Sequence, residues 1–256
     1  MDGAGSNVSG DAGLVTADEA DNAPTLPAEY AWLEGSQPFV ACAFYTPNYL
    51  PQVLSLKASL EKFGINHYLK QYERGATWEA TTRLKPVFVN HCIDKFPDRH
   101  VLYLDADAVV RRPMTLIEEI ETDIAIAFHP LKAGGRNYLR ISAGALFVRN
   151  NEKGRRFARA WMDAEKDCGP LTLDEDMIYM SFDTLQGASI TVLPATYYKI
   201  FDRPGADPVL EHFQASRKQF KWRRLIRRAR RVAVGVGVVA AALLVWWLSR
   251  HIAWVP

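Results

Sequence analysis

Cysteine is scarce in this sequence, and the three cysteines lie far apart, at positions 42, 92 and 168. None of them belongs to a CxxC pair, so the sequence predicts neither a zinc ribbon nor a thioredoxin-like redox site. Cys42 and Cys92 lie in apolar segments, where a buried thiol is the expected state. Unpaired, reduced thiols indicate intracellular surroundings for the domain that carries them.

Positive charge is absent from the first 36 residues, which contain seven Asp or Glu and no Lys or Arg. This stretch also lacks the basic start and the apolar run of a signal peptide. Its Gly, Ala, Ser and Asp content predicts a disordered acidic segment over residues 1–36. The opposite charge dominates residues 217–231, which hold nine Lys or Arg and no acid. The small net charge of +2 therefore conceals an acidic head and a basic neck.

The middle of the chain has no internal repeat and no low-complexity tract, and it predicts one α/β domain over residues 37–218. Apolar runs and amphipathic segments alternate at its start. They predict strands at 39–46, 65–72 and 101–105, with helices at 47–64 and 85–96 between them. This order predicts parallel pairing with right-handed crossovers. Further strands are expected at 123–130, 141–150 and 190–194, the last as a core strand, and further helices at 151–167 and 174–185.

A long apolar run stands near the C-terminus, where residues 232–248 contain no charged side chain. At about 1.5 Å per residue, a helix of this length reaches across a hydrocarbon core. We therefore expect a basic juxtamembrane neck at 219–231, a single-pass transmembrane helix at 232–249 and a short tail at 250–256. The cations before the run place the neck and the domain on the cytoplasmic side. A buried C-terminal helix is the alternative, and nucleic-acid binding by the arginines is the weaker interpretation.

The stretch VLYLDADAVVRRP, residues 101–113, places Asp105 and Asp107 at the end of an apolar strand. Two carboxylates at the end of a core strand are costly unless a cation lies between them. Hard divalent cations favour carboxylate oxygens, so the pair predicts a metal site.

Two enzyme classes use a D-x-D pair of this kind. The pair resembles that of phosphatases of the haloacid dehalogenase type, with Asp105 as the nucleophile and Asp107 as the proton donor. In that fold the pair normally follows the first strand, whereas here two predicted strands and two predicted helices precede it. The phosphatase resemblance is therefore confined to one short motif.

A second resemblance covers residues 39 to about 218 and joins five motifs in order: FVACAFYT with its following helix, VLYLDADAVVRRP, ISAGALFVRN, LDEDMIYMSF and VLEHFQASRK. Together they resemble glycosyltransferases of the GT-A fold, especially the glycogenin-like and lipopolysaccharide-galactosyltransferase groups. The resemblance implies a single Rossmann-like domain with a mixed sheet. Glu175 stands where these enzymes usually have Gln, and the basic group after His212 lacks their usual Gly and Trp.

The resemblance also implies roles for individual residues. Asp105, Asp107 and His212 would bind Mn²⁺, or else Mg²⁺, because mixed oxygen and imidazole donors suit manganese. The expected contacts to the nucleotide-sugar donor are Tyr45, Thr46, Arg83, Lys85, Asp105, Ser142, Gly144 and Lys218. Among them, Tyr45 would stack on the base. Asp174 and Glu175 would face the sugar and the acceptor, and Arg217 would hold the diphosphate after bond cleavage.

The sequence thus predicts a metal-dependent hexosyltransferase that uses a UDP-sugar, acts on a membrane-associated or glycan acceptor and retains the configuration of the sugar. No nucleic-acid partner is expected. Two alternatives stay open, namely the phosphatase and a non-catalytic membrane adaptor whose basic neck is the working part. The intact D-A-D and the downstream histidine and arginine argue against a degenerate site.

Overall fold

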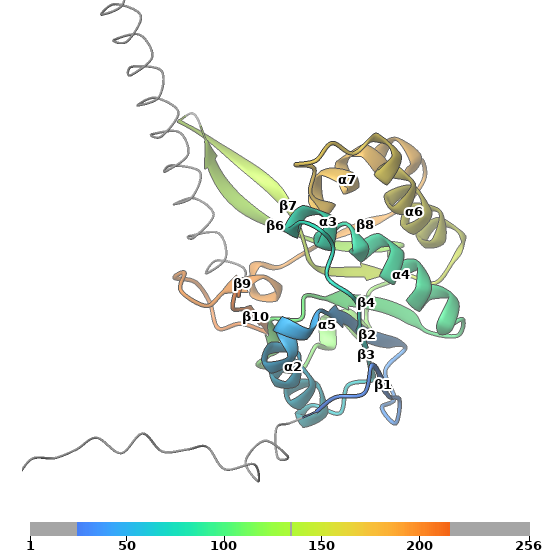
Figure 1. The fold of residues 1–256 in the computed structure, drawn as a ribbon, viewed down its shortest axis with the longest axis vertical. Helices are drawn as coiled ribbons and strands as arrows, with labels where there is room; N and C mark the ends of the chain where they lie inside the picture. The colour runs from blue at the N-terminus through green and yellow to red at the C-terminus, as the bar shows by residue number, and fades with distance from the viewer. Residues whose placement is uncertain (1–24, 134, 216–256) are drawn as a thin grey trace, which may run out of the picture.

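The structure is a computed structural model that describes residues 25–133 and 135–215, and these fold into two sheets with helices on both faces of the larger one (Figure 1). The strand order is β1-β3-β2-β4-β7-β6-β8 in the larger sheet and β5-β10-β9 in the smaller one. The strands are β1 Glu29–Trp32, β2 Phe39–Tyr45, β3 His67–Gln71, β4 His100–Leu104, β5 Ala108–Val110, β6 Ile124–Ala133, β7 Arg136–Val148, β8 Ile190–Leu193, β9 Lys199–Ile200 and β10 Leu210–His212. The helices are α2 Leu50–Lys62, α3 Trp78–Thr82, α4 Leu84–Lys95, α5 Thr115–Glu118, α6 Glu152–Asp163 and α7 Asp174–Ser181, with 3-10 turns η1 Pro47–Tyr49, η2 Ala164–Asp167, η3 Phe182–Thr184 and η4 Ala195–Tyr197.

The centre of the large sheet is parallel, because β2 pairs in parallel with β3 on one side and with β4 on the other. All residues of β2 are buried, as expected for a strand that is covered on both faces. Helices α2 and α4 connect these strands, which confirms the predicted βαβαβ order. Cys42 on β2 and Cys92 on α4 are buried free thiols, as expected.

Alternate residues of β2 point into two separate cores. Ala41 and Ala43 belong to the core beneath α2, and Cys42 and Phe44 belong to the core beneath α4, α6 and α7. The fold therefore has three layers, with the sheet in the middle. The second core is rich in aromatic side chains, and its Trp161 on α6 is fully buried.

The second half of the large sheet is mostly antiparallel, since β7 pairs antiparallel with both β4 and β6. The register of β6 and β7 shifts between the pairs Ile126↔Leu146 and Ala127↔Ser142, so residues 143–145 of β7 bulge out of this ladder. Bulges of this kind often lie beside active sites, because they redirect the backbone locally. Here the bulge lies beside the end of β4, where the two aspartates follow.

Strands β6 and β7 are longer than predicted and form a hairpin that extends beyond the sheet (Figure 1). The prediction ended the first strand at Pro130. Strand β6 pairs with β8 only over Ile124–Ala127, so Pro130 lies where β6 is an edge strand. A proline is tolerated there because no ladder partner needs its N–H. Strand β8 was expected in the core, but it is the last strand of the sheet and its Val192 is 63% exposed.

Strand β1 falls inside the segment that was expected to be disordered. It pairs antiparallel with β3, and Glu29 forms an ion pair with Lys70 at 2.6 Å. The expectation of disorder therefore does not hold for Glu29–Trp32, because this short strand is stabilised by pairing with the sheet edge that it joins.

Among residues 25–133 and 135–215, no helix has both the length and the apolar character that crossing a membrane requires. The predicted neck at 219–231, membrane helix at 232–249 and tail at 250–256 lie outside the described residues, as do residues 1–24 of the acidic head.

Candidate functional site

The two aspartates lie in the turn that joins β4 of the large sheet to β5 of the small one. Buried apolar residues fill β4 up to Leu104. The next residue, Asp105, donates its backbone N–H to the Gly144 carbonyl at 2.9 Å, which fixes the turn against the bulge of β7. The Tyr103 hydroxyl donates to Asp105 Oδ1 at 3.1 Å.

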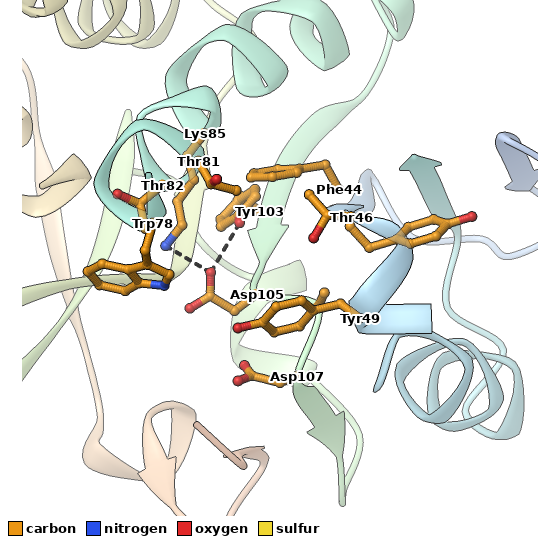
Figure 2. Close-up of a pocket in the computed structure, with 12 residues that line it drawn as sticks. Phe44, Thr46, Tyr49, Trp78, Thr81, Thr82, Lys85, Tyr103, Asp105 and Asp107 are labelled. Carbon is orange, nitrogen blue, oxygen red and sulfur yellow. Dashed lines mark hydrogen bonds and ion pairs between the residues drawn. The ribbon is translucent and has the colours of Figure 1, made fainter. Parts of the chain in front are cut away.

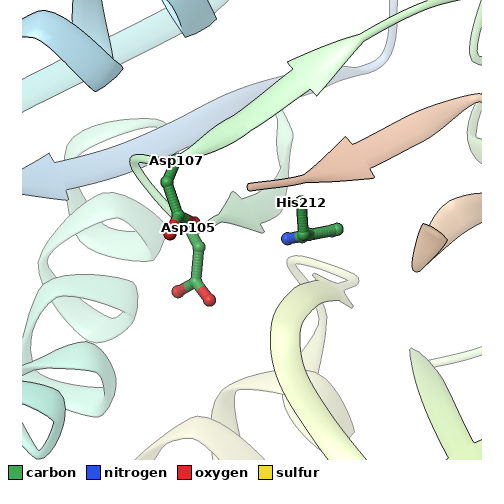
Figure 3. A group of neighbouring side chains, drawn as sticks. All are labelled: Asp105, Asp107 and His212. Carbon is green, nitrogen blue, oxygen red and sulfur yellow. The ribbon is translucent and has the colours of Figure 1, made fainter. Parts of the chain in front are cut away.

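Strand β10 brings His212 to these aspartates from a distant part of the chain. It pairs antiparallel with β5, so that His212 lies opposite Ala108. The backbone N–H of Ala215 donates to Asp107 Oδ2 at 2.7 Å. As a result, one possible ligand atom from each of Asp105, Asp107 and His212 lies within 4.8 Å of the others, and Figure 3 shows the three side chains around a common space. The structure thus brings together the three residues predicted to bind metal.

The donor atoms of this cluster fit a divalent cation. The imidazole of His212 is hydrogen-bonded to the backbone of Tyr197, while its buried Nε2 has no hydrogen-bond partner among the described residues. Burial lowers the pKa of His212 to about 4, although Asp105 opposes this shift, so the imidazole is neutral at pH 7. Burial raises the pKa of Asp107 to about 6, and the nearby Asp105 adds to this rise. A neutral imidazole beside two crowded carboxylates is a suitable ligand set for Mn²⁺ or Mg²⁺.

Lys85 links the first aspartate to the start of α7. Its Nζ lies 2.8 Å from Asp105 Oδ1 and 2.7 Å from Asp174 Oδ2. Burial alone lowers the pKa of Lys85, but the two carboxylates raise it well above its ordinary value, so the side chain is a buried cation. Lys85 was predicted to contact the donor, and the structure gives it a second role as the bridge between two predicted site residues.

Glu175 lies beside this bridge and is paired with a different cation. The α7 start is fixed by Asp176, whose Oδ2 accepts the Leu173 N–H at 3.0 Å. Glu175 Oε2 lies 2.8 Å from Nε of Arg140, on the β6–β7 hairpin. Burial raises the pKa of Glu175 to about 7, and Asp174 adds to the rise, while Arg140 opposes it.

A pocket opens beside the aspartates at the carboxyl ends of β2 and β4 (Figure 2). This edge of a parallel sheet is where α/β folds bind their ligands. Aromatic and hydroxyl side chains line the pocket together with the charged groups: Phe44, Tyr45, Thr46, Tyr49, Trp78, Thr81, Thr82, Lys85, Tyr103, Asp105, Ala106 and Asp107. Apolar walls with a few polar groups are typical of a site for a small-molecule ligand.

Tyr49 was missed by the sequence analysis. Burial raises its pKa to about 12, and the carboxylates of Asp107 and Asp105 contribute to this rise. Its ring extends from η1 towards the two aspartates (Figure 2). The tyrosine predicted to stack on the base, Tyr45, also lines the pocket, but it is only 1% exposed, lies within the core beneath α2 and donates its hydroxyl to the Pro27 carbonyl at 3.4 Å.

The other predicted donor contacts differ in position. Thr46 lines the pocket and donates to Asn48 Oδ1 at 2.7 Å. Arg83 is directed elsewhere, because its Nε donates to Glu165 at 3.0 Å and its Nη1 donates to the Thr172 carbonyl at 3.1 Å. Arg217 and Lys218 lie outside the described residues.

Ser142 and Gly144, which the motif resemblance assigned to the sugar donor, lie on β7 beside the cluster of Asp105, Asp107 and His212. Ser142 is fully buried, and its Oγ accepts the Gly144 N–H at 3.3 Å. A Cβ atom at position 144 would lie 2.9 Å from Asp105 Oδ2 and 3.2 Å from His212 Cε1. Only glycine therefore fits here without moving the cluster.

No protein-family model matches the sequence, and no curated protein matches it either. A search of solved structures does find similar folds. The crystal structure of a glycosyltransferase involved in the glycosylation of the major capsid of PBCV-1 superposes with a TM-score of 0.57, at 16% identity, over 71% of this chain and 96% of that one. The chain has a GT-A-like fold.

Two further glycosyltransferases align with lower scores. GlyE of Streptococcus pneumoniae TIGR4 gives a TM-score of 0.45 at 19% identity, over 69% of this chain and 55% of that one. The galactosyltransferase LgtC, solved in complex with donor and acceptor sugar analogs, gives 0.44 at 12% identity, over 69% of this chain and 87% of that one.

Proposed function

We propose that this chain is a metal-dependent hexosyltransferase that transfers a sugar from a UDP-sugar to a glycan or lipid-linked acceptor. The observation that carries the proposal is the cluster of Asp105, Asp107 and His212, whose ligand atoms lie within 4.8 Å of one another at the edge of the pocket. The GT-A-like fold supports the same conclusion, since the cluster follows a strand at the ligand-binding edge of its sheet.

The pocket suits the nucleoside of the donor. In this proposal Tyr49 stacks on the base, and Trp78 and the threonines of α3 line the other side. Asp105, Asp107 and His212 hold Mn²⁺ or Mg²⁺, which would offset the negative charge of the two donor phosphates and of the departing diphosphate. Arg217 and Lys218 follow Ala215 closely in the sequence, so we assign them to the diphosphate as well.

Retention of configuration is part of the proposal. The bond between the anomeric carbon and the phosphate oxygen breaks, the acceptor oxygen forms its bond on the same face, and the acceptor proton passes to the leaving phosphate oxygen. This reaction needs no ionised protein base. The pairing of Asp174 with Lys85 and of Glu175 with Arg140 supports it, because both carboxylates are held by cations and suit a role in orienting sugar hydroxyls.

The acceptor is proposed to lie at a membrane surface. The support is the sequence alone, in which the basic residues 217–231 are followed by the uncharged run 232–248. Anchoring would raise the concentration of the domain near a lipid-linked acceptor without requiring new contacts to it. Limited proteolysis of sealed vesicles that expose their cytoplasmic face tests this arrangement: the domain is expected to be cleaved, and its protection would refute the proposed orientation.

The activity test uses the full chain in detergent with Mn²⁺ and a panel of nucleotide sugars, and it measures the release of nucleoside diphosphate. Release from one donor is expected, and it should be lost on chelation and in Asp107→Asn. The matched control is Asp94→Asn, because Asp94 is an exposed carboxylate paired with Arg155 at 2.8 Å. The control should keep the wild-type rate.

The same assay separates the alternatives. Phosphate release from simple phosphate esters, with a covalent intermediate on Asp105 and no dependence on His212, would identify a phosphatase instead. Membrane binding that survives Asp107→Asn, together with a failure to bind nucleotide or metal, would identify an adaptor.

A further inference from the structure

Tyr198 is the middle ring of three that lead away from the metal-binding cluster. It follows η4, and its ring centroid lies 4.7 Å from that of His212, with the planes at 45°. On the hairpin side, its ring is stacked on His129 with the centroids 5.6 Å apart and the planes at 28°. Tyr198 therefore lies closer to the imidazole of His212 than to that of His129.

The Tyr198 ring is fixed by the bulge of β7. A Cβ atom at Gly144 would lie 3.0 Å from Tyr198 Cε2, so the ring edge lies against the backbone of this residue. Its hydroxyl interacts with the hydroxyl of Ser142, which is itself fully buried. A ring that is held at its edge and at its hydroxyl cannot rotate freely, and it can therefore act as a rigid surface for its neighbour.

The residue before Tyr198 also holds the imidazole of His212, through its backbone rather than its side chain. The backbone of Tyr197 bonds to the imidazole, and Nε2 has no partner among the described residues. In metal sites, the group that bonds to the second ring nitrogen fixes the tautomer, and neighbouring groups fix the plane of the ring. Tyr197 can supply the first function through its backbone, and Tyr198 can supply the second through its ring.

We propose that Tyr198 is a positioning residue that holds the His212 imidazole in the plane from which Nε2 can bind the metal. This inference rests on the proposed function, because it assumes that Asp105, Asp107 and His212 bind a divalent cation. It assigns the task to the aromatic ring, and it gives the hydroxyl only the task of anchoring that ring to Ser142.

The test measures Mn²⁺ binding to the full chain directly, by electron paramagnetic resonance of the free ion. Tyr198→Leu removes the ring and is expected to weaken Mn²⁺ binding about 10- to 100-fold. Tyr198→Phe keeps the ring and is expected to stay within about threefold of wild type. The matched control is Tyr138→Leu on the hairpin, where the tyrosine is 48% exposed, and no change is expected there.

A double-mutant cycle separates positioning from general damage to the fold. In a His212→Ala background, Tyr198→Leu should cause no further loss of Mn²⁺ affinity, because a positioning residue acts only through the group that it positions. Equal losses in both backgrounds would overturn the proposal, and so would wild-type affinity in Tyr198→Leu. A wild-type chain that binds no Mn²⁺ would overturn the metal site itself, which is a distinguishable result.

Discussion

Lys85 Nζ lies 2.8 Å from Asp105 Oδ1, so the carboxylate that begins the D-x-D pair is bound to a buried cation. The same nitrogen lies 2.7 Å from Asp174 Oδ2 at the start of α7. One ammonium group therefore bridges two carboxylates that come from separate segments of the chain. Removing it leaves buried negative charge without a partner.

Lys85→Met is expected to lower the free energy of unfolding by about 3–5 kcal/mol. The change removes the cation of a buried ion pair and leaves its carboxylate partners without a countercharge in a low-dielectric interior. Urea unfolding of the two proteins measures the loss. Combining Lys85→Met with Asp174→Asn should recover part of it. The control is Lys57→Met, since Lys57 forms a more exposed helical pair with Glu61 at 2.6 Å and should cost no more than about 1 kcal/mol. Equal losses in the two single variants would contradict the prediction.

Gly144→Ala is expected to damage the metal site more than the fold. Its Cβ would lie 2.9 Å from Asp105 Oδ2 and 3.0 Å from Tyr198 Cε2, so the groups around the cluster must move apart. Overpacking of this kind costs about 1–3 kcal/mol of stability, whereas Mn²⁺ affinity, measured by titration calorimetry, should fall at least tenfold. Gly169→Ala is the control, because its nearest neighbour would be Thr172 Oγ1 at an ordinary 3.7 Å. Mn²⁺ affinity that is unchanged in Gly144→Ala would show that the cluster tolerates the shift.

The sequence alone predicted the elements whose signal is local. The strands β2 and β4 are almost wholly buried, so each appears as an apolar run, and the aspartates follow the end of β4 directly. It also anticipated His212, because the motif resemblance gave the order of the segments. What places His212 beside Asp105 is the pairing of β10 with β5, and strands of three residues carry too short a pattern to be recognised.

The direction of a side chain was harder to predict than its presence. Arg83 and Lys85 both stand at the start of α4, and the sequence analysis assigned both of them to the donor. Two residues along a helix differ in direction by about 200°, so only one of them can face the pocket. Lys85 does, and Arg83 instead contacts Glu165. Tyr49 and Tyr198 were missed for a similar reason, since an aromatic residue near a turn has the same sequence pattern whether it packs in a core or lines a site.

Tyr49→Ala is expected to weaken the binding of UDP in the presence of Mn²⁺ by about 1–3 kcal/mol, the usual contribution of an aromatic ring stacked on a base. Tyr49→Phe should bind almost as well as wild type, because the ring remains. Isothermal titration of each variant measures the difference. Tyr45→Phe serves as the control, since this change removes only the hydrogen bond to Pro27 from a buried side chain. Unchanged UDP binding in Tyr49→Ala would contradict the prediction.

Glu175→Gln is expected to change how stability depends on pH. Burial and Asp174 raise the pKa of Glu175 to about 7, from a model-peptide value of 4.5. A carboxyl group with a raised pKa binds its proton more tightly in the folded chain, so folding stability decreases as the pH rises from about 4.5 to about 7. A glutamine at this position does not titrate, and the variant should therefore gain stability relative to wild type across this interval.

The difference in melting temperature between Glu175→Gln and wild type, measured at several pH values, isolates this contribution, because every other titrating group is shared. The melting temperature of the variant minus that of wild type should have its lowest value at low pH, where the wild-type carboxyl is protonated and neutral like the amide. This difference should then increase with pH and level off above about pH 8. Arg140 opposes the rise in the pKa from 2.8 Å away, so Arg140→Gln should shift the wild-type transition to higher pH. A difference in melting temperature that is independent of pH would show that the ion pair with Arg140 holds Glu175 ionised throughout, and that its role is to hold a fixed negative charge beside the sugar.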